Sequence, residues 1–337
     1  MRYNPSDVAK KGSIFGLPYS REEADVVLLP VHLETTVSYR EGTAQSPNLI
    51  LEESAQLDLS LPSVDKPWEL KLFFEDRLVD KDKHDESRGR AKRVIDHLEA
   101  GIPPDKKDIE EVNEYCRLVH QQVEETCKSH LAKGKWVGII GGEHSSPLGL
   151  INALSSEHHF GILQVDAHMD LRNAYEGFAY SHASIMYQAL KAEGVKSLTQ
   201  VGIRDYSEEE ENYIADSSKK ISVFFDEVLF QQRVHGTLWS DQVKEIINTL
   251  PDNVYLSFDV DGLEPSLCPN TGTPVPGGLT FQEAIFLIEE VVRSERKIIG
   301  FDVCEAGNAQ WDANVGARII YRLAVAMGVS QGQLEFR

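Results

Sequence analysis

The chain has 337 residues, of which 41% are hydrophobic and 26% are charged, and its formal net charge at pH 7 is -20. This length suffices for one large α/β domain with a substantial core, or for two smaller domains. The excess of carboxylates favours solubility and repels phosphate groups, so we expect neither nucleic acid nor an anionic membrane as a partner.

The sequence contains no pattern typical of secretion or membrane insertion. The first 20 residues include Lys10 and Lys11 but lack the continuous apolar stretch of a signal peptide. Nowhere does the chain reach the roughly 18 consecutive apolar residues that a membrane span requires. The four cysteines are widely separated and form no zinc-type pair: Cys116, Cys127, Cys268 and Cys304. We therefore expect a cytoplasmic protein with reduced thiols and no membrane partner.

Seven short apolar runs have the composition of buried parallel strands, since most are rich in β-branched or aromatic residues. They cover residues 26–31, 136–140, 160–165, 198–203, 221–225, 254–258 and 298–303.

Segments with helical spacing lie between these runs. Residues 107–133 carry apolar side chains at three- and four-residue steps, and Gly134 is expected to end this helix. A helix over 281–294 begins with a capping box in which Thr280 is the N-cap, and residues 317–327 form a further helix. Strands that alternate with helices imply a mostly parallel sheet with helices on both faces. Ligands of such sheets bind beyond the carboxyl ends of the strands.

The segment 62–107 departs from this alternation. It is dense in charged residues and carries an apolar patch at residues 68–74. We predict that it is an insertion or a lid-like excursion within one domain that spans residues 1–337, rather than a separate domain.

Three motifs place metal-binding side chains directly after predicted strands. They read Gly141-Gly142-Glu143-His144-Ser145, Asp166-Ala167-His168-Met169-Asp170 and Ser257-Phe258-Asp259-Val260-Asp261. Alternate side chains of an extended segment leave on one face, so the donors within each motif can converge. A lone Asp-x-Asp pair is usually a turn, and a lone histidine is usually an ordinary polar residue. Together, two imidazoles and four carboxylates instead favour an oxygen-rich site for two divalent ions, which indicates metal-activated water and hydrolysis.

With these motifs the chain resembles the ureohydrolases, the arginase and agmatinase group, whose loops read like GGDHS, DAHxD and SxDxD. The resemblance runs from about residue 26 to residue 325, with the insertion excepted. Its most specific part is SFDVDGLEP at 257–265, which continues to TGTP at 271–274 and GGLT at 277–280.

The resemblance implies a fold and a ligand set. The expected fold is arginase-like, a single three-layer α/β/α domain with a mostly parallel sheet of about eight strands. Two manganese ions per chain would be bound, and the bridging hydroxide would attack the guanidinium carbon and release urea. The first ion would be held by His144, Asp166, Asp170 and Asp259, and the second by Asp166, His168, Asp259 and Asp261. Cobalt, nickel or iron would also suit this ligand set.

Two further residues match catalytic positions of the family. His182, in the run YSHAS at 180–184, matches the proton-handling histidine, and Glu305, in FDVCE at 301–305, matches the glutamate that orients the guanidinium. Both roles make chemical sense, because an amine leaving group needs a proton and a planar cation needs a carboxylate.

The run DLRNAYEG at 170–177 is similar to the agmatinase branch, whereas arginases carry a loop there with threonine, serine and asparagine. The expected substrate is therefore a small cationic guanidine, agmatine, which would be cleaved to putrescine and urea. The alternatives keep the chemistry and change the substrate to arginine, a guanidino acid, formiminoglutamate or guanidine.

Two other hypotheses fit the ligand pattern less well. A non-catalytic, metal-free family member would have lost ligands, whereas all six ligands, His182 and Glu305 are present. A zinc-dependent deacylase on a related fold would keep fewer carboxylates and bind one metal.

The resemblance also implies a homotrimer or homohexamer. Glu143 departs from the family pattern, because it replaces the usual aspartate before the metal-binding histidine, and such a change beside the ligands can alter metal preference.

Overall fold

Eight parallel strands form one sheet in the computed structural model of the chain, which describes residue 4, residue 10 and residues 12–337. The order of the strands across the sheet is β2-β1-β3-β8-β7-β4-β5-β6. Their bounds are β1 Val26–Val31, β2 Leu72–Phe74, β3 Trp136–Gly141, β4 Phe160–Val165, β5 Val195–Ile203, β6 Lys220–Phe225, β7 Asn253–Asp259 and β8 Lys297–Cys304.

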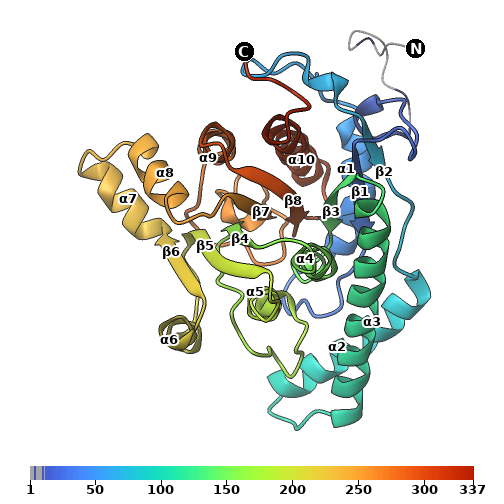
Figure 1. Cartoon of the computed structure of the whole chain (residues 1–337). Coiled ribbons are helices and arrows are strands. Elements are labelled where there is room, and N and C mark those ends of the chain that lie inside the picture. Colours follow the sequence, from blue (N-terminus) through green and yellow to red (C-terminus); the bar gives the residue numbers. More distant parts are fainter. Residues whose placement is uncertain (1–3, 5–9, 11) are drawn as a thin grey trace.

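Helices cover both faces of this sheet (Figure 1). One face carries α1 Ser46–Ser54, α7 Asp226–Val234, α8 Trp239–Ile247, α9 Phe281–Arg293 and α10 Gln310–Ser330. The other face carries α3 Lys106–Leu131, α4 Leu148–Ser155, α5 Ile185–Ala189 and α6 Glu208–Asp216. Short 3-10 helices in the described residues span Ile14–Gly16, Thr43–Gln45, Pro67–Glu69, His182–Ser184 and Val260–Gly262. This arrangement confirms the predicted α/β/α fold class.

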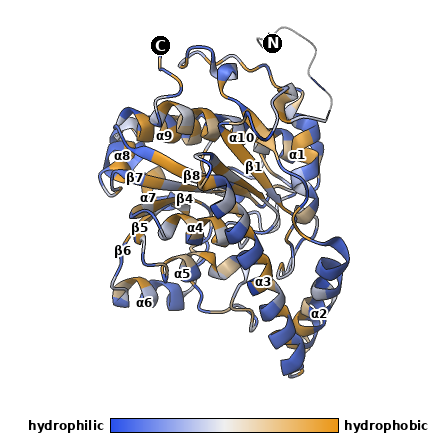
Figure 2. Cartoon of the chain, turned by 45° about the vertical axis from the view of Figure 1, so that its right-hand side comes forward, coloured by the Kyte–Doolittle hydropathy of each residue, from blue (hydrophilic) through white to orange (hydrophobic). Residues whose placement is uncertain are grey.

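Each face of the sheet packs into its own hydrophobic core. On β1, for example, Leu28 belongs to the core beneath α1 and α10, and its neighbour Leu29 belongs to the core beneath α3 and α4. Strands that are buried on both faces need apolar side chains at nearly every position, which explains why continuous apolar runs located seven of the eight strands. Figure 2 shows the strands as predominantly hydrophobic.

The predicted elements agree with the structure except at some boundaries. The strands at 26–31 and 160–165 have the predicted bounds, while β5 begins three residues earlier than predicted, at Val195. The prediction for α10 began too late, since this helix starts at Gln310 rather than at residue 317. No side chain caps its first turn, so the sequence carries no start signal there.

The segment 62–107 contains β2 and α2 (Lys81–Glu99). β2 pairs in parallel with β1 at the edge of the sheet, and α2 packs against α3. Some of the charged residues of α2 form ion pairs with α3. Arg90 and Arg93 lie 3.2 and 2.9 Å from Asp108 of α3. Figure 2 accordingly shows α2 as predominantly hydrophilic.

Within the described part of the chain, none of the helices combines the length and the apolar character needed to cross a membrane.

Candidate metal centre

Four neighbouring strands at the centre of the sheet lead into the predicted site residues. These strands lie in the order β3-β8-β7-β4. His144 follows β3, Glu305 follows β8, Asp259 ends β7, and Asp166 follows β4. Because all strands are parallel, their carboxyl ends meet at one edge, where α/β sheets commonly bind ligands.

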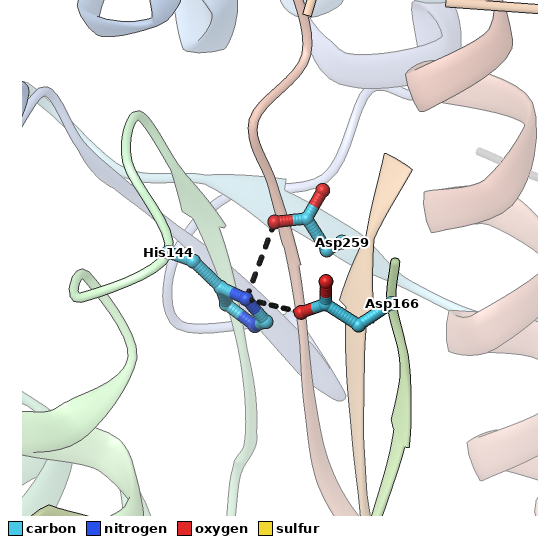
Figure 3. Close-up of side chains that lie close together, drawn as sticks. All are labelled: His144, Asp166 and Asp259. Carbon is cyan, nitrogen blue, oxygen red and sulfur yellow. Dashed lines mark ion pairs between the residues drawn. The ribbon is translucent and has the colours of Figure 1, made fainter. Parts of the chain in front are cut away.

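The imidazole of His144 lies among three carboxylates, of which Figure 3 shows those of Asp166 and Asp259. Its Nδ1 is 2.9 Å from Asp166 Oδ2, 3.0 Å from Asp170 Oδ2 and 3.2 Å from Asp259 Oδ2. On the other side of the ring, Nε2 is 2.9 Å from the Ser257 hydroxyl, which fixes the ring orientation.

A second group of potential ligands surrounds His168. Its Nδ1 lies 3.1 Å from Asp261 Oδ2 and 3.6 Å from Asp166 Oδ1. Asp166 therefore faces both imidazoles, one with each oxygen. Asp259 lies in the His144 group, and its other oxygen accepts a hydrogen bond of 2.8 Å from the Asp261 backbone N–H. The structure thus brings five predicted ligands together in two adjoining groups that share Asp166, and the sixth, Asp170, lies 3.0 Å from His144.

The surroundings of these side chains suit divalent cations. All four carboxylates are nearly inaccessible, with exposed fractions of 4% or less. Burial and the repulsion of Asp166 raise the pKa of Asp170 to about 7, and burial with the charges of Asp261 and Asp166 raises the pKa of Asp259 well above its usual range. The buried His144 Nδ1 has no hydrogen bond of acceptable geometry although carboxylate oxygens surround it. A divalent cation among these atoms would relieve the repulsion and use this nitrogen as a ligand.

The backbone at Asp170 adopts a left-handed conformation with φ 55°, which is uncommon for a residue with a side chain. Its carbonyl accepts hydrogen bonds from the backbone N–H groups of Met186 and Tyr187 at 3.1 and 3.2 Å. Two contacts from α5 thus hold the conformation that turns the Asp170 carboxylate toward His144.

Glu305 has one carboxylate oxygen without a partner beside the two groups of potential ligands. Its Oε1 accepts a 2.8 Å hydrogen bond from the His144 backbone N–H, whereas Oε2 is buried and has no partner. Burial raises the pKa of Glu305 well above its usual range, and the nearby Glu143 adds to this effect. A cation that binds Oε2 would offset that burial, so this side chain is suited to a guanidinium.

His182 lies at the start of the 3-10 helix His182–Ser184, with its Nδ1 3.2 Å from the Thr36 hydroxyl. Burial, followed by the charges of His168 and His144, lowers the pKa of His182 to about 3. The imidazole is therefore neutral at pH 7.

A cavity of about 140 Å³ joins His182 to the His168 group. Tyr175, Arg172 and Asp205 also line it. The Arg172 guanidinium is paired with Glu210 at 3.6 Å and lies over the Tyr175 ring at 4.6 Å. The cavity therefore offers an exposed carboxylate at Asp205, whose Oδ2 lies 3.8 Å from the His168 Nε2.

Thr36 was not among the predicted site residues, although it joins two of them. Its backbone N–H and hydroxyl donate to Glu143 Oε2 at 2.7 and 3.1 Å, and its hydroxyl contacts His182. No motif surrounds Thr36 in the sequence. Its position shortly after β1 was the only available signal, since ligands gather at the carboxyl ends of strands. Glu143, with one methylene more than the usual aspartate, is thus occupied by Thr36 and by the Ser145 hydroxyl, which donates at 2.7 Å.

Comparison with known proteins gives consistent matches over most of the chain. The model of the arginase family matches residues 24–327. An N(1)-aminopropylagmatine ureohydrolase of Thermus thermophilus is 33% identical over 322 residues, which cover 94% of each chain. The agmatinase of Bacillus subtilis is 30% identical over 305 residues, 89% of this chain and 90% of the relative. The solved structure of proclavaminate amidino hydrolase from Streptomyces clavuligerus superposes with a TM-score of 0.75 at 20% identity, over 96% of this chain and 99% of that one.

Proposed function

The chain belongs to the arginase family and is a ureohydrolase, a hydrolase of guanidino substrates, and from this premise we propose that it uses two manganese ions to hydrolyse agmatine to putrescine and urea. The observation that carries the proposal is the free, buried Oε2 of Glu305 next to two adjoining groups of metal ligands.

The ligand groups suit hard divalent ions such as Mn²⁺, because most of their donors are carboxylate oxygens. His144, Asp166, Asp170 and Asp259 would hold one ion, and Asp166, His168, Asp259 and Asp261 the other. Such a pair of ions would supply a water that is deprotonated at neutral pH.

The side chains around the ions would handle the substrate. Glu305 Oε2 would accept hydrogen bonds from the guanidinium and hold its central carbon next to the ligand groups. His182, which is neutral at rest, would take up a proton and deliver it to the departing amine.

The cavity supports a substrate with a cationic tail. The exposed carboxylate of Asp205 would attract an amine, and the Glu210 carboxylate, 3.6 Å from the Arg172 Nε, balances the charge of that guanidinium. Relatives at 30% identity or above include the agmatinase of Bacillus subtilis and three N(1)-aminopropylagmatine ureohydrolases. N(1)-aminopropylagmatine, which has a second cationic group in its tail, is therefore the second candidate substrate.

Urea release by the manganese-loaded protein tests the proposal. Agmatine, N(1)-aminopropylagmatine, arginine, guanidinobutyrate and guanidine would be offered separately at equal concentration. We expect the largest kcat/KM with agmatine. A preference for arginine or guanidinobutyrate would overturn the substrate assignment, and the absence of urea from all five would overturn the proposed function.

Assembly as a homotrimer or homohexamer is also proposed, on family membership alone. Light scattering should give a mass that is three or six times the 37.8 kDa of one chain. A monomeric mass at assay concentration would contradict it.

A further inference from the structure

Helix α2, from the charge-rich segment 62–107, contacts the loop that follows β1. Two of its side chains one turn apart, His84 and Arg88, reach this loop. His84 Nε2 accepts a hydrogen bond of 3.0 Å from the Glu34 backbone N–H. Arg88 Nη1 donates to the carbonyl oxygens of Thr35 and Val37 at 3.2 and 2.7 Å. The guanidinium therefore binds the carbonyls on both sides of Thr36.

Hydrogen bonds within the same loop also join its beginning to its end. The Glu34 carboxylate is buried and accepts hydrogen bonds from the backbone N–H groups of Gly42 and Ala44. These contacts fix the two ends of the loop, 34 and 42–44. Between them, α2 supplies the hydrogen bonds to the Thr35 and Val37 carbonyls, and both residues are buried, at 0% and 3% exposure.

Thr36 connects this loop to His182 through its hydroxyl group. Its hydroxyl lies 3.1 Å from Glu143 Oε2 and 3.2 Å from His182 Nδ1. An ionised carboxylate can only accept, so the hydroxyl proton is directed to Glu143. The hydroxyl oxygen then accepts a hydrogen bond from His182 Nδ1–H. This contact favours the tautomer whose Nε2 carries the free lone pair, while the Ser181 hydroxyl lies 3.3 Å from the same Nδ1.

We propose that Arg88, assisted by His84, is a positioning residue for His182 and acts through Thr36. This inference deepens the proposed function and rests on it, because His182 is the proton-handling group there. It also gives the segment 62–107 a function. Its helix α2 would keep His182 in position, although α2 contains none of the predicted metal ligands.

The geometry explains why an arginine is needed at this position. Nη1 serves two carbonyls, while Nη2 donates to Glu41 Oε1 at 2.9 Å. A lysine has one nitrogen at the end of a flexible stem and cannot reproduce this planar fork. The Arg88 side chain is only 16% exposed, so its hydrogen bonds are largely shielded from water.

The test compares Arg88→Met with a matched control on the same helix. Arg93→Met removes an exposed guanidinium that pairs with Asp108 and does not touch the 34–37 loop. We expect Arg88→Met to lower kcat on the order of tenfold to a hundredfold, with KM and metal content nearly unchanged. Arg93→Met should leave kcat unchanged. Arg88→Lys, which keeps the charge and is milder for folding, should restore part of the loss.

A kinetic double-mutant cycle separates positioning from a general structural effect. Thr36→Val removes the hydroxyl at nearly constant volume. If Arg88 acts through Thr36, the double variant will be about as slow as Thr36→Val alone. Losses of kcat that multiply in the double variant, or an Arg88→Met loss no larger than that of Arg93→Met, would overturn the inference.

Hydrogen exchange keeps this test independent of the proposed function. If the native protein releases urea from no guanidine, the proposed function fails. The effect of Arg88 on the stability of the 34–37 loop can still be measured in that case. Backbone amides of residues 33–38 should exchange faster in Arg88→Met and Arg88→Lys than in Arg93→Met. Equal exchange in all these variants would show that α2 does not hold the loop.

Discussion

Asp166 faces both imidazoles of the metal centre, His144 through Oδ2 at 2.9 Å and His168 through Oδ1 at 3.6 Å. Replacing one of its oxygens by an amide should therefore weaken both ligand groups. For Asp166→Asn we expect fewer than two metal ions per chain and a fall in turnover of at least about a hundredfold. Elemental analysis and the urea assay measure these effects, with Asp216→Asn at the end of α6 as a control. Two bound ions with full turnover would refute the ligand assignment.

Glu305 tests recognition of the guanidinium separately from metal binding. Glu305→Gln keeps the shape of the side chain, but removes the charge from an oxygen that is buried without a partner. We expect kcat/KM for agmatine to fall by at least about tenfold, with no loss of thermal stability, because burial already disfavours the carboxylate. Unchanged kinetics would exclude a role for Glu305 in substrate binding.

His182 tests proton transfer. Its Nδ1 lies 3.2 Å from the Thr36 hydroxyl and 3.3 Å from the Ser181 hydroxyl, and neither of these residues is a predicted metal ligand. His182→Ala should leave both metal ions bound while kcat falls on the order of a hundredfold or more. If metal content fell together with kcat, His182 would have to be reassigned as a metal ligand.

At the scale of single elements, the start of α9 shows how a local signal determines structure. Thr280 and Glu283 form a capping box in which the Thr280 hydroxyl lies 3.3 Å from the Glu283 N–H and the Glu283 carboxylate accepts from the Thr280 N–H at 2.9 Å. Thr280→Ala removes the first of these bonds and should lower the free energy of unfolding by about 1 kcal/mol. Chemical denaturation measures this loss.

Thr126→Ala, in the C-terminal part of α3, is the matched control for the cap. Its hydroxyl bonds only to the carbonyl of Gln122 one turn earlier, a contact that contributes little to helix stability. Equal losses in the two variants would show that the cap is not what stabilises α9.

At the scale of the whole molecule, metal binding and folding should be linked. The four buried carboxylates repel one another in the folded chain, and the two ligand groups exist only when β3, β4 and β7 are assembled. Ions that bind only the folded state stabilise it by about 2.7 kcal/mol at a hundredfold excess over Kd.

Removal of metal by a chelator should therefore lower Tm by several degrees, and added Mn²⁺ should restore it. Differential scanning calorimetry of the native protein and of Asp166→Asn measures this, and the variant should show a smaller metal-dependent shift. A Tm that does not respond to metal in the native protein would contradict binding at this centre.

Much of the fold, and the grouping of the candidate ligands, was predictable because the relevant signals are local. Burial on both faces requires continuous apolar strands, and a ligand motif such as Asp166-Ala167-His168-Met169-Asp170 places its donors within five residues. The helix start at Thr280 is likewise determined within one turn. The exceptions include the three-residue strand β2, the uncapped start of α10, and several helices that were not predicted, such as α1, α2, α7 and α8.

The contacts that complete the site depended on tertiary structure. The strand order places β8 between β3 and β7, which brings Glu305 against His144, 161 residues away in the sequence. Thr36 contacts Glu143 and His182, which lie 107 and 146 residues away in the sequence. Arg88 binds the carbonyl of Val37, next to Thr36, from a segment in which the sequence showed only a high density of charge. Composition and periodicity report whether a residue is buried and in which element it lies. The partner that a buried polar group meets is set by strand order, register and loop packing, which are properties of the assembled chain.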